Sequence, residues 1–367
     1  MKLKLITSSV ALSLLMAIAP NCQNKIQAQG LVPVPKEILE YRDFLTPQNT
    51  FDVPSSSENL NWENLALLYS LENHQAPVVS LAFNPQGDIL VSSGSTNDPS
   101  MRFWAMTTGK QIDSQRAHAT RVMAVAYSPD GTSIVSAGQG AGINLWDGNN
   151  REYRATFLLH ANNIMDIAIS PDSSTLVSGA LDGIRVWNLK YARPVFTLIG
   201  VGNPSYALGM HPNGYLIASG NREGKVSFWN LRTAELISEF SPHKAEIQGL
   251  IFTPDGRRII TSSTEKTIKI WDLTTGELVR EFTGHRDDIH TIALSPDSKI
   301  LASGGKDGVR IWEVATGELI TLIPGNSDWV ESLAFSPDST ILAIGSYSTK
   351  IQVWKATTRE PVAVNNQ

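Results

Sequence analysis

The segment TPDGRRIITSSTEKTIKIWD, residues 253–272, contains the pattern that decides the fold of this chain. Its first four residues suit a type I turn, because proline fixes φ at the second position and Asp and Gly favour the next two. Two runs rich in β-branched residues follow, at 259–262 (IITS) and 267–271 (TIKIW), and such runs predict short strands. The segment therefore predicts a tight turn and two strands, of which the second ends at a tryptophan.

The same pattern recurs with a nearly constant period. A further strand is predicted before each turn, as at 78–83, and another after each tryptophan, as at 277–282, which gives four strands per unit. Four-stranded units of about this length are typical of β-propeller blades. We therefore expect an all-β fold, a seven-bladed propeller of four-stranded antiparallel blades over residues 66–367. Seven of the nine tryptophans mark the units, at intervals of 41 or 42 residues: Trp104, Trp146, Trp187, Trp229, Trp271, Trp312 and Trp354.

The repeats resemble those of the WD-repeat family from Leu67 to Trp354. Only Trp146-Asp147 and Trp271-Asp272 keep the literal Trp-Asp pair. The resemblance implies a hydrogen-bonded core in each blade, formed by a His, a hydroxyl residue, an Asp and the Trp. A His beside an Asp and a hydroxyl is also the composition of a catalytic triad, but its recurrence in several blades favours a structural role. Three blades have the complete set: His74, Asp98 and Trp104; His160, Asp182 and Trp187; His285, Asp307 and Trp312.

Other blades depart from this set. His243 is expected to pair with Glu265 in place of an Asp, and His118 has no acid at the corresponding position. Residues 67–71 predict the outer strand that closes the ring beside the strand ending at Trp354. Residues 361–364 compete for the same place, and the sequence leaves this choice open.

The resemblance also implies which side chains lie on the top face of the propeller: the third and fifth residues after each His position and the residue before each acid. Large apolar, aromatic and Arg side chains on a rigid rim suit a protein or peptide interface. Any one of the apolar residues could instead pack along the channel wall. Trp329 is the strongest candidate, because Trp354 already serves as the structural tryptophan of its blade. The predicted partner-binding residues are Arg121, Met123, Met165, Leu181, Tyr206, Arg222, Trp329 and Tyr347.

The opposite sector of the same face is predicted to be acidic, with Glu246, Asp287, Asp288, His290 and Glu331. These residues could hold a cation or perform acid-base chemistry, but a solvated acidic surface is the favoured interpretation. The sequence contains no glycine-rich phosphate loop, nucleophile elbow or His-Glu-x-x-His motif. We expect no cofactor, no metal and no enzymatic activity.

The N-terminal region resembles a secretory signal peptide. Lys2 and Lys4 precede an apolar run of residues 5–19, which is shorter than the roughly 20 residues of a membrane-spanning helix. Cleavage is predicted after Ala28, and lipidation of Cys22, which would tether an envelope protein, is the alternative. Residues 29–65 are rich in Pro and Ser and predict a linker with one short helix. These features predict an exported bacterial protein, periplasmic or extracellular.

Charge and composition restrict the function further. The net charge is −5 and there is no basic tract, which disfavours binding to nucleic acid. Cys22 is the single cysteine, so a disulfide framework is excluded. We expect a non-catalytic scaffold, a monomeric propeller within a complex, that binds proteins or peptides. A carbohydrate-binding or cell-wall-binding propeller, and a hydrolase or metal-dependent enzyme that uses the acidic sector, are the alternatives.

Overall fold

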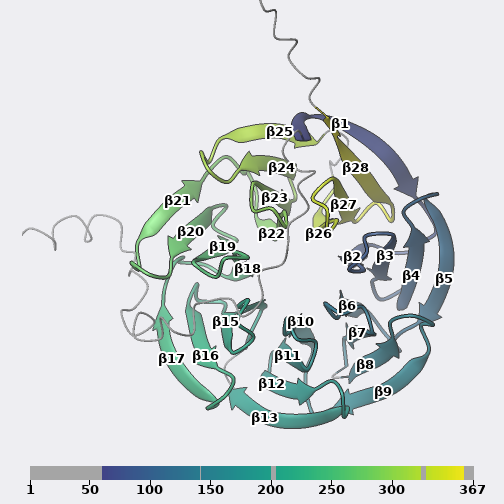
Figure 1. Ribbon diagram of the computed structural model, residues 1–367, viewed down its shortest axis with the longest axis vertical. Coiled ribbons are helices and arrows are strands. Elements are labelled where there is room, and N and C mark those ends of the chain that lie inside the picture. Colours follow the sequence, from purple (N-terminus) through teal and green to yellow (C-terminus); the bar gives the residue numbers. More distant parts are fainter. Residues whose placement is uncertain (1–59, 141, 200–203, 324–327, 359–367) are drawn as a thin grey trace, which may run out of the picture. The chain divides into compact units, whose positions relative to one another are not determined.

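Seven four-stranded antiparallel sheets surround a central axis in the computed structural model, which describes residues 60–140, 142–199, 204–323 and 328–358 (Figure 1). Each sheet is one blade, and its four strands lie side by side in order from the axis to the rim. The predicted seven-bladed propeller is therefore confirmed. These residues include no helix that is long and apolar enough to cross a membrane.

The blades follow one another in chain order, and blade 7 combines both ends of the described chain. Blade 1 consists of β2 (Val78–Phe83), β3 (Ile89–Gly94), β4 (Ser100–Ala105) and β5 (Lys110–Arg116), and blade 2 of β6 (Val122–Tyr127), β7 (Ser133–Gly138), β8 (Gly142–Asp147) and β9 (Tyr153–Leu158). Blade 3 consists of β10 (Ile164–Ile169), β11 (Thr175–Ala180), β12 (Gly183–Asn188) and β13 (Arg193–Ile199), and blade 4 of β14 (Ala207–Met210), β15 (Leu216–Gly220), β16 (Val226–Asn230) and β17 (Glu235–Phe240). Blade 5 consists of β18 (Ile247–Phe252), β19 (Arg258–Ser263), β20 (Ile268–Asp272) and β21 (Leu278–Phe282), and blade 6 of β22 (Ile289–Leu294), β23 (Ile300–Gly305), β24 (Gly308–Glu313) and β25 (Leu319–Ile323). Blade 7 consists of β26 (Val330–Phe335), β27 (Ile341–Ser346), β28 (Ile351–Thr358) and β1 (Leu60–Leu71).

The turn between the first two strands of a blade is held by its own side chains. In blade 2 the N–H of Gly131 donates to the carbonyl of Ser128 at 2.8 Å, and the Ser128 hydroxyl donates to Asp130 at 2.6 Å. The same hydroxyl accepts the N–H of Ser133 at 2.9 Å. Gly131 has a φ of +73°, a conformation that glycine adopts without strain. The turn motif thus fixes the register of the two strands that follow one another in sequence.

The periodic tryptophans fill the seams between blades. Trp187 of blade 3 packs on Phe157 of β9 with ring centroids 5.1 Å apart. Trp271 meets Phe240 of β17 at 5.4 Å and Trp312 meets Phe282 of β21 at 5.6 Å in the same way. These three indoles therefore cover the outer strand of the preceding blade, a role that accounts for a tryptophan at this position of the repeat.

A buried hydrogen-bonded chain of side chains crosses blade 1, as the family resemblance predicted. The Trp104 indole donates to the Ser92 hydroxyl at 2.8 Å, and this hydroxyl and the His74 Nε2 atom are 2.7 Å apart. On its other side, His74 Nδ1 lies 2.7 Å from the Asp98 carboxylate. A neutral His74 satisfies every group, because Nδ1–H donates to Asp98 and Nε2 accepts from Ser92. Burial lowers the pKa of His74, which agrees with this neutral form.

The same chain recurs where it was predicted. Blade 3 joins His160 to Asp182 at 2.8 Å, and blade 6 joins His285 to Asp307 at 2.7 Å. In blade 5, His243 pairs with Glu265 at 2.6 Å. Ser92 is 0% exposed, so its hydroxyl cannot meet a substrate. The arrangement supports the structural interpretation of these residues.

Each of these four acids also binds a cation that the sequence analysis missed. Arg102 donates to Asp98 at 2.5 Å, and although burial acts to raise the pKa of Asp98, the hydrogen bonds from His74 and Arg102 hold it well below its usual range. The cation stands two residues before the structural tryptophan in each such blade. Blade 2, which lacks the acid, has Asn144 at this position. The other three cation contacts are Arg185 to Asp182 at 2.9 Å, Lys269 to Glu265 at 3.1 Å and Arg310 to Asp307 at 2.8 Å.

Two polar side chains on innermost strands link neighbouring blades. The Ser80 hydroxyl accepts the N–H of Val125 at 3.1 Å, which joins blade 1 to blade 2. In blade 3 a carboxylate takes this place, and Asp166 accepts the N–H of Leu208 at 2.8 Å and that of Ile167 at 2.8 Å. Burial nevertheless raises the pKa of Asp166 to about 6. This seam thus contains a carboxyl group that gains a proton in mildly acidic solution.

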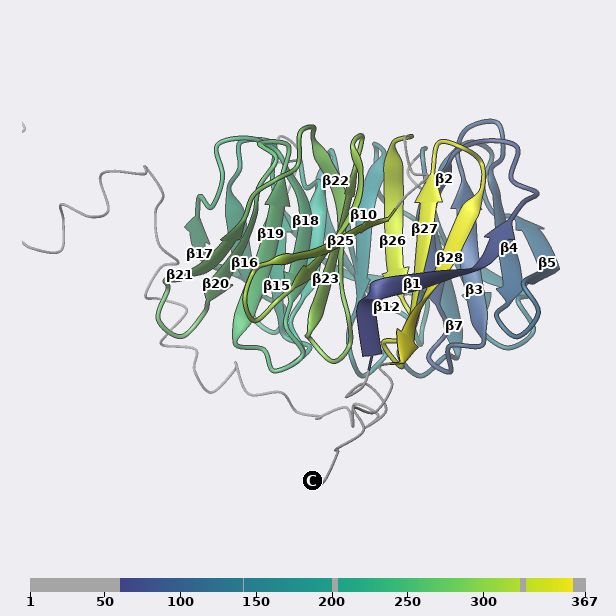
Figure 2. The same cartoon turned by 90° about the horizontal axis from the view of Figure 1, so that it is seen from above.

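The ring is closed by the N-terminal strand. β1 pairs antiparallel with β28, with Leu67 opposite Trp354, and forms the outer edge of blade 7 (Figures 1 and 2). The predicted closing strand at 67–71 is confirmed. It begins earlier, at Leu60, so the strand includes six residues of the range 29–65 that was expected to be a linker. Trp62 accounts for the difference, because its side chain is 4% exposed and packs on Phe335 at 5.2 Å. Residues 361–364, the competing segment, and the proposed helix within 29–59 lie outside the described residues.

Candidate binding face

The loops at one end of the propeller present the predicted partner-binding residues. We define the top face as the end that bears the loop before the first strand of each blade and the loop between its second and third strands. Arg121, Tyr206 and Trp329 directly precede β6, β14 and β26 by one residue, and Leu181, Arg222 and Tyr347 lie between second and third strands. Met123 and Met165 lie in β6 and β10 near the same end.

These eight residues differ in exposure. Trp329 is 39% exposed and Tyr347 is 48% exposed, and Arg222 is also exposed. The other five are partly buried: Arg121, Met123, Met165, Leu181 and Tyr206. The large accessible rings are therefore confined to blade 7.

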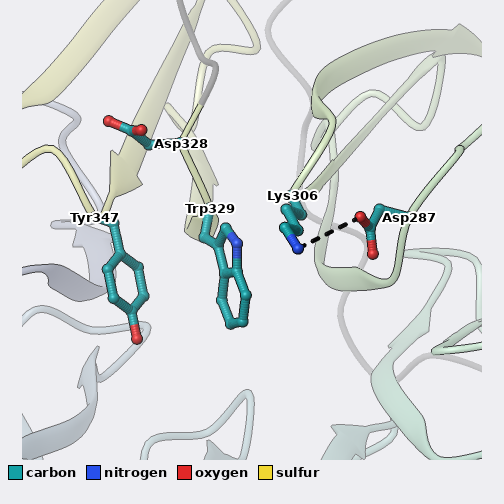
Figure 3. Close-up of a pocket in the computed structure, with 5 residues that line it drawn as sticks. All are labelled: Asp287, Lys306, Asp328, Trp329 and Tyr347. Carbon is teal, nitrogen blue, oxygen red and sulfur yellow. Dashed lines mark ion pairs between the residues drawn. The ribbon is translucent and has the colours of Figure 1, made fainter.

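A cavity of about 530 Å³ surrounds these two rings (Figure 3). We call it the aromatic pocket, and it is lined by Asp287, Lys306, Asp328, Trp329 and Tyr347. Its residues come from the top-face loops of blades 6 and 7. Asp328 was not identified in the sequence analysis, because it precedes Trp329 at a position where no repeat-based contact was expected.

The aromatic rings of the pocket are held by one another. Trp329 and Tyr347 meet edge to face, with centroids 5.5 Å apart and an interplanar angle of 61°. His290 of β22 stacks on Trp329 at 5.3 Å and 20°. The indole is thus supported by the neighbouring blade although much of it remains accessible, which suits a preorganised contact.

The cations of the top face are paired with its acids. Lys306 Nζ lies 3.9 Å from the Asp287 carboxylate, and Arg222 Nε lies 3.7 Å from that of Glu246. Arg121 of blade 2 reaches Glu331 of blade 7 at 3.5 Å, past the intervening blade 1. The arginines and the acids were predicted to lie in opposite sectors, whereas Arg121 and Arg222 form ion pairs with Glu331 and Glu246.

Metal binding receives no support from this geometry. Within the described ranges, no three His, Cys, Asp or Glu residues are grouped closely enough to hold a metal ion. Glu246 and Glu331, two members of the acidic sector, are instead engaged by arginines. The described part of the top face therefore offers rings and ion pairs rather than a set of metal ligands.

The fold and this face can be compared with known proteins. A family model described as "WD domain, G-beta repeat" matches six segments of the chain. Three strands of blade 4, β14 to β16, and its Trp229 fall in the interval between the third and fourth segments, although the structure forms all three strands. The matched residues are 65–105, 109–147, 151–188, 234–272, 276–313 and 317–355.

Several curated proteins are similar to part of the chain. "Periodic tryptophan protein 2 homolog" of Caenorhabditis elegans is 23% identical over 191 residues, which is 51% of this chain and 21% of that protein. "Anaphase-promoting complex subunit cdh1" of Dictyostelium discoideum is 26% identical over 175 residues, 47% of this chain and 18% of that protein. "Nuclear distribution protein PAC1-2" of Uncinocarpus reesii is 25% identical over 193 residues, 44% of this chain and 41% of that protein. The match thus spans about a fifth of the first two relatives.

Proposed function

Because the chain belongs to the WD domain, G-beta repeat family, we propose that it is a non-catalytic scaffold that binds a protein or peptide partner on the top face of its propeller. The observation that carries this proposal is the exposed pair of Trp329 and Tyr347. Neither ring takes part in the hydrogen-bonded chains of the blades. Large exposed rings held in place on a rigid rim are the side chains that contribute most to protein interfaces.

The family relationship supports the same proposal. WD-repeat propellers act in protein interactions and scaffolding, and one relative is named as a subunit of a protein complex. The His, Asp and Ser arrangement within the blades is buried, which disfavours a hydrolytic role for it. The ring of seven blades gives the partner a surface whose shape is set before binding, which reduces the entropy lost on association.

We also propose that the protein is exported. The support is the sequence of residues 1–28, in which two lysines precede a short apolar run and the small residue Ala28 precedes Gln29. Removal of this segment would eliminate three lysines and the only cysteine, Cys22. The remaining chain would have no free thiol, which suits an oxidising compartment such as a bacterial periplasm.

The scaffold proposal can be tested with three matched baits: the protein, its Trp329→Ala variant and its Tyr191→Ala variant. Tyr191 is 62% exposed in the turn between β12 and β13, at the opposite end of the propeller, so its removal controls for the loss of a surface ring. Proteins captured from the source cells are identified by mass spectrometry, and each candidate is then purified and titrated against all three baits.

We expect at least one purified partner to bind the protein and the Tyr191→Ala variant with equal affinity. Trp329→Ala should weaken this binding about 30-fold or more, as expected for a central interface ring. Trp329 is partly exposed, so its replacement should leave the thermal midpoint nearly unchanged. Partners that bind all three baits with the same affinity would contradict the assignment of the top face.

A further inference from the structure

The aromatic pocket already contains a cation of the protein itself. Lys306 Nζ lies 5.4 Å from the centroid of the Trp329 ring, a distance at which an ammonium group is attracted to the face of an indole. Figure 3 shows the indole standing between Lys306 and Tyr347, with the ammonium group also directed at Asp287. The pocket therefore has the components that hold a positive charge: an aromatic face and a carboxylate.

Lys306 is held only loosely in this position. Its side chain is 51% exposed, and that of Asp287 is 41% exposed. An ion pair at such a surface contributes little, because water and salt screen it and a long side chain has to be immobilised. A cation brought by a partner can therefore take the place of Lys306 at small cost.

The charge balance of the pocket favours a basic ligand. Asp287 and Asp328 contribute two negative charges, and Lys306 contributes one positive charge. Displacement of Lys306 into solvent would leave these two carboxylates of the lining without its positive charge. The net charge of −5 adds a long-range attraction for basic segments. A neutral ligand that displaced Lys306 would leave these carboxylates without a counter-charge, and an acidic ligand would be repelled by them.

We infer that the aromatic pocket binds a lysine or arginine side chain of the partner, which displaces Lys306 from the Trp329 ring. This inference rests on the proposed function, since it states the chemistry of the partner at the same face. Lys306 then acts as an internal competitor that occupies the pocket in the free protein. The partner segment is expected to be basic, and its affinity is expected to fall as salt concentration rises.

The test uses the protein labelled with 5-fluorotryptophan and hexalysine as the probe. The ¹⁹F resonance that disappears in Trp329→Phe is that of Trp329, and it reports on this site separately from the other tryptophans. Hexa-(ε-acetyl)lysine is the matched uncharged probe. Hexalysine should shift the Trp329 resonance in a saturable manner, and the acetylated peptide should not.

Two variants examine the roles of the charges. Asp328→Asn should weaken hexalysine binding about threefold, as expected for one exposed carboxylate. Lys306→Met should strengthen it by about the same factor, because it removes the competitor. Lys225→Met is the control, because it removes a lysine from an ion pair with Glu239 in blade 4. This control should bind hexalysine with a dissociation constant within about 1.5-fold of that of the unmodified protein.

The inference is overturned if both probes shift the Trp329 resonance equally, if neither does, or if Lys306→Met weakens binding. None of these results needs the natural partner. Failure of this titration therefore leaves the result of the bait experiment, and with it the proposed function, unaffected.

Discussion

The Arg102 guanidinium donates a hydrogen bond of 2.5 Å to the Asp98 carboxylate inside blade 1, and both residues are less than 10% exposed. Every described blade whose acid bonds to its histidine has such a cation, and blade 2, whose histidine has no acid, has Asn144 instead. Acid and cation are thus present together or absent together. This pairing is expected, because a lone buried charge costs far more than a matched pair.

Removal of one member of this pair should therefore be costly. Arg102→Met should lower the free energy of unfolding by about 3 kcal/mol, because it leaves Asp98 buried without its cation. The double variant Arg102→Met/Asp98→Asn should lose less than the sum of the two single variants. Urea denaturation of the four proteins measures this coupling, and additive losses would contradict it.

The seam between blades 3 and 4 should respond to pH through Asp166. Burial raises the pKa of this group to about 6, so the folded protein binds its proton more tightly than the unfolded chain does. Its contribution to stability is complete at low pH and is lost as pH rises through 6. We compare the protein with Asp166→Asn, which cannot ionise. The free energy of unfolding of the natural protein, measured relative to that of Asp166→Asn, should fall by about 2 kcal/mol between pH 4.5 and 7.5. A difference that is independent of pH would show that Asp166 does not titrate in this range.

The histidines should make the protein sensitive to acid. Burial lowers the pKa of six of them, so their contribution to stability is present above about 6.5 and is lost as pH falls below that value. Thermal unfolding of Asp166→Asn, which lacks the opposing effect of that carboxyl, should show a lower midpoint at pH 5.5 than at pH 7.5. An unchanged midpoint would mean that these histidines titrate alike in the folded and unfolded states. The six are His74, His118, His160, His211, His243 and His285.

Export should leave a defined N-terminus. When the gene is expressed with its leader in a bacterial host, the mature protein is expected to begin at Gln29, since cleavage follows Ala28. Intact-mass spectrometry distinguishes this product from its alternatives. A lipid-modified chain that begins at Cys22 would show that cleavage occurs before Cys22 and not after Ala28. A chain that keeps Lys2 would contradict export.

The sequence was sufficient to predict the seven-bladed ring, because one turn motif and one tryptophan per unit mark the positions of the strands and of the seams between blades. It was also sufficient for the His74 and Asp98 pairing, which occurs at fixed places in the repeat. Arg102 was missed although it left a signal, namely a basic residue two positions before the tryptophan in each blade that has both the histidine and its acid. The early start of β1 was missed because Trp62 lies within a stretch rich in polar residues, where no alternation marks a strand.

The arrangement of the top face was beyond sequence reasoning for a different reason. The contact of Arg121 with Glu331 joins blades 2 and 7, so it depends on the width of the ring and on two long side chains. The stacking of His290 on Trp329 likewise depends on how closely blade 6 approaches blade 7. Repeat positions predict which residues reach this face, but not which of them meet.

Closure of the ring by β1 sets the order in which the protein can assemble. The Thr357 hydroxyl donates to the carbonyl of Asn64, two residues that are 293 positions apart. At a synthesis rate of about 5–20 residues per second, β1 waits roughly 15 to 60 s for its partner strand. During this interval its pairing edge is open to other chains. The first of the described strands to be made is therefore the last to be paired, and its edge stays open to other chains until β28 has been made.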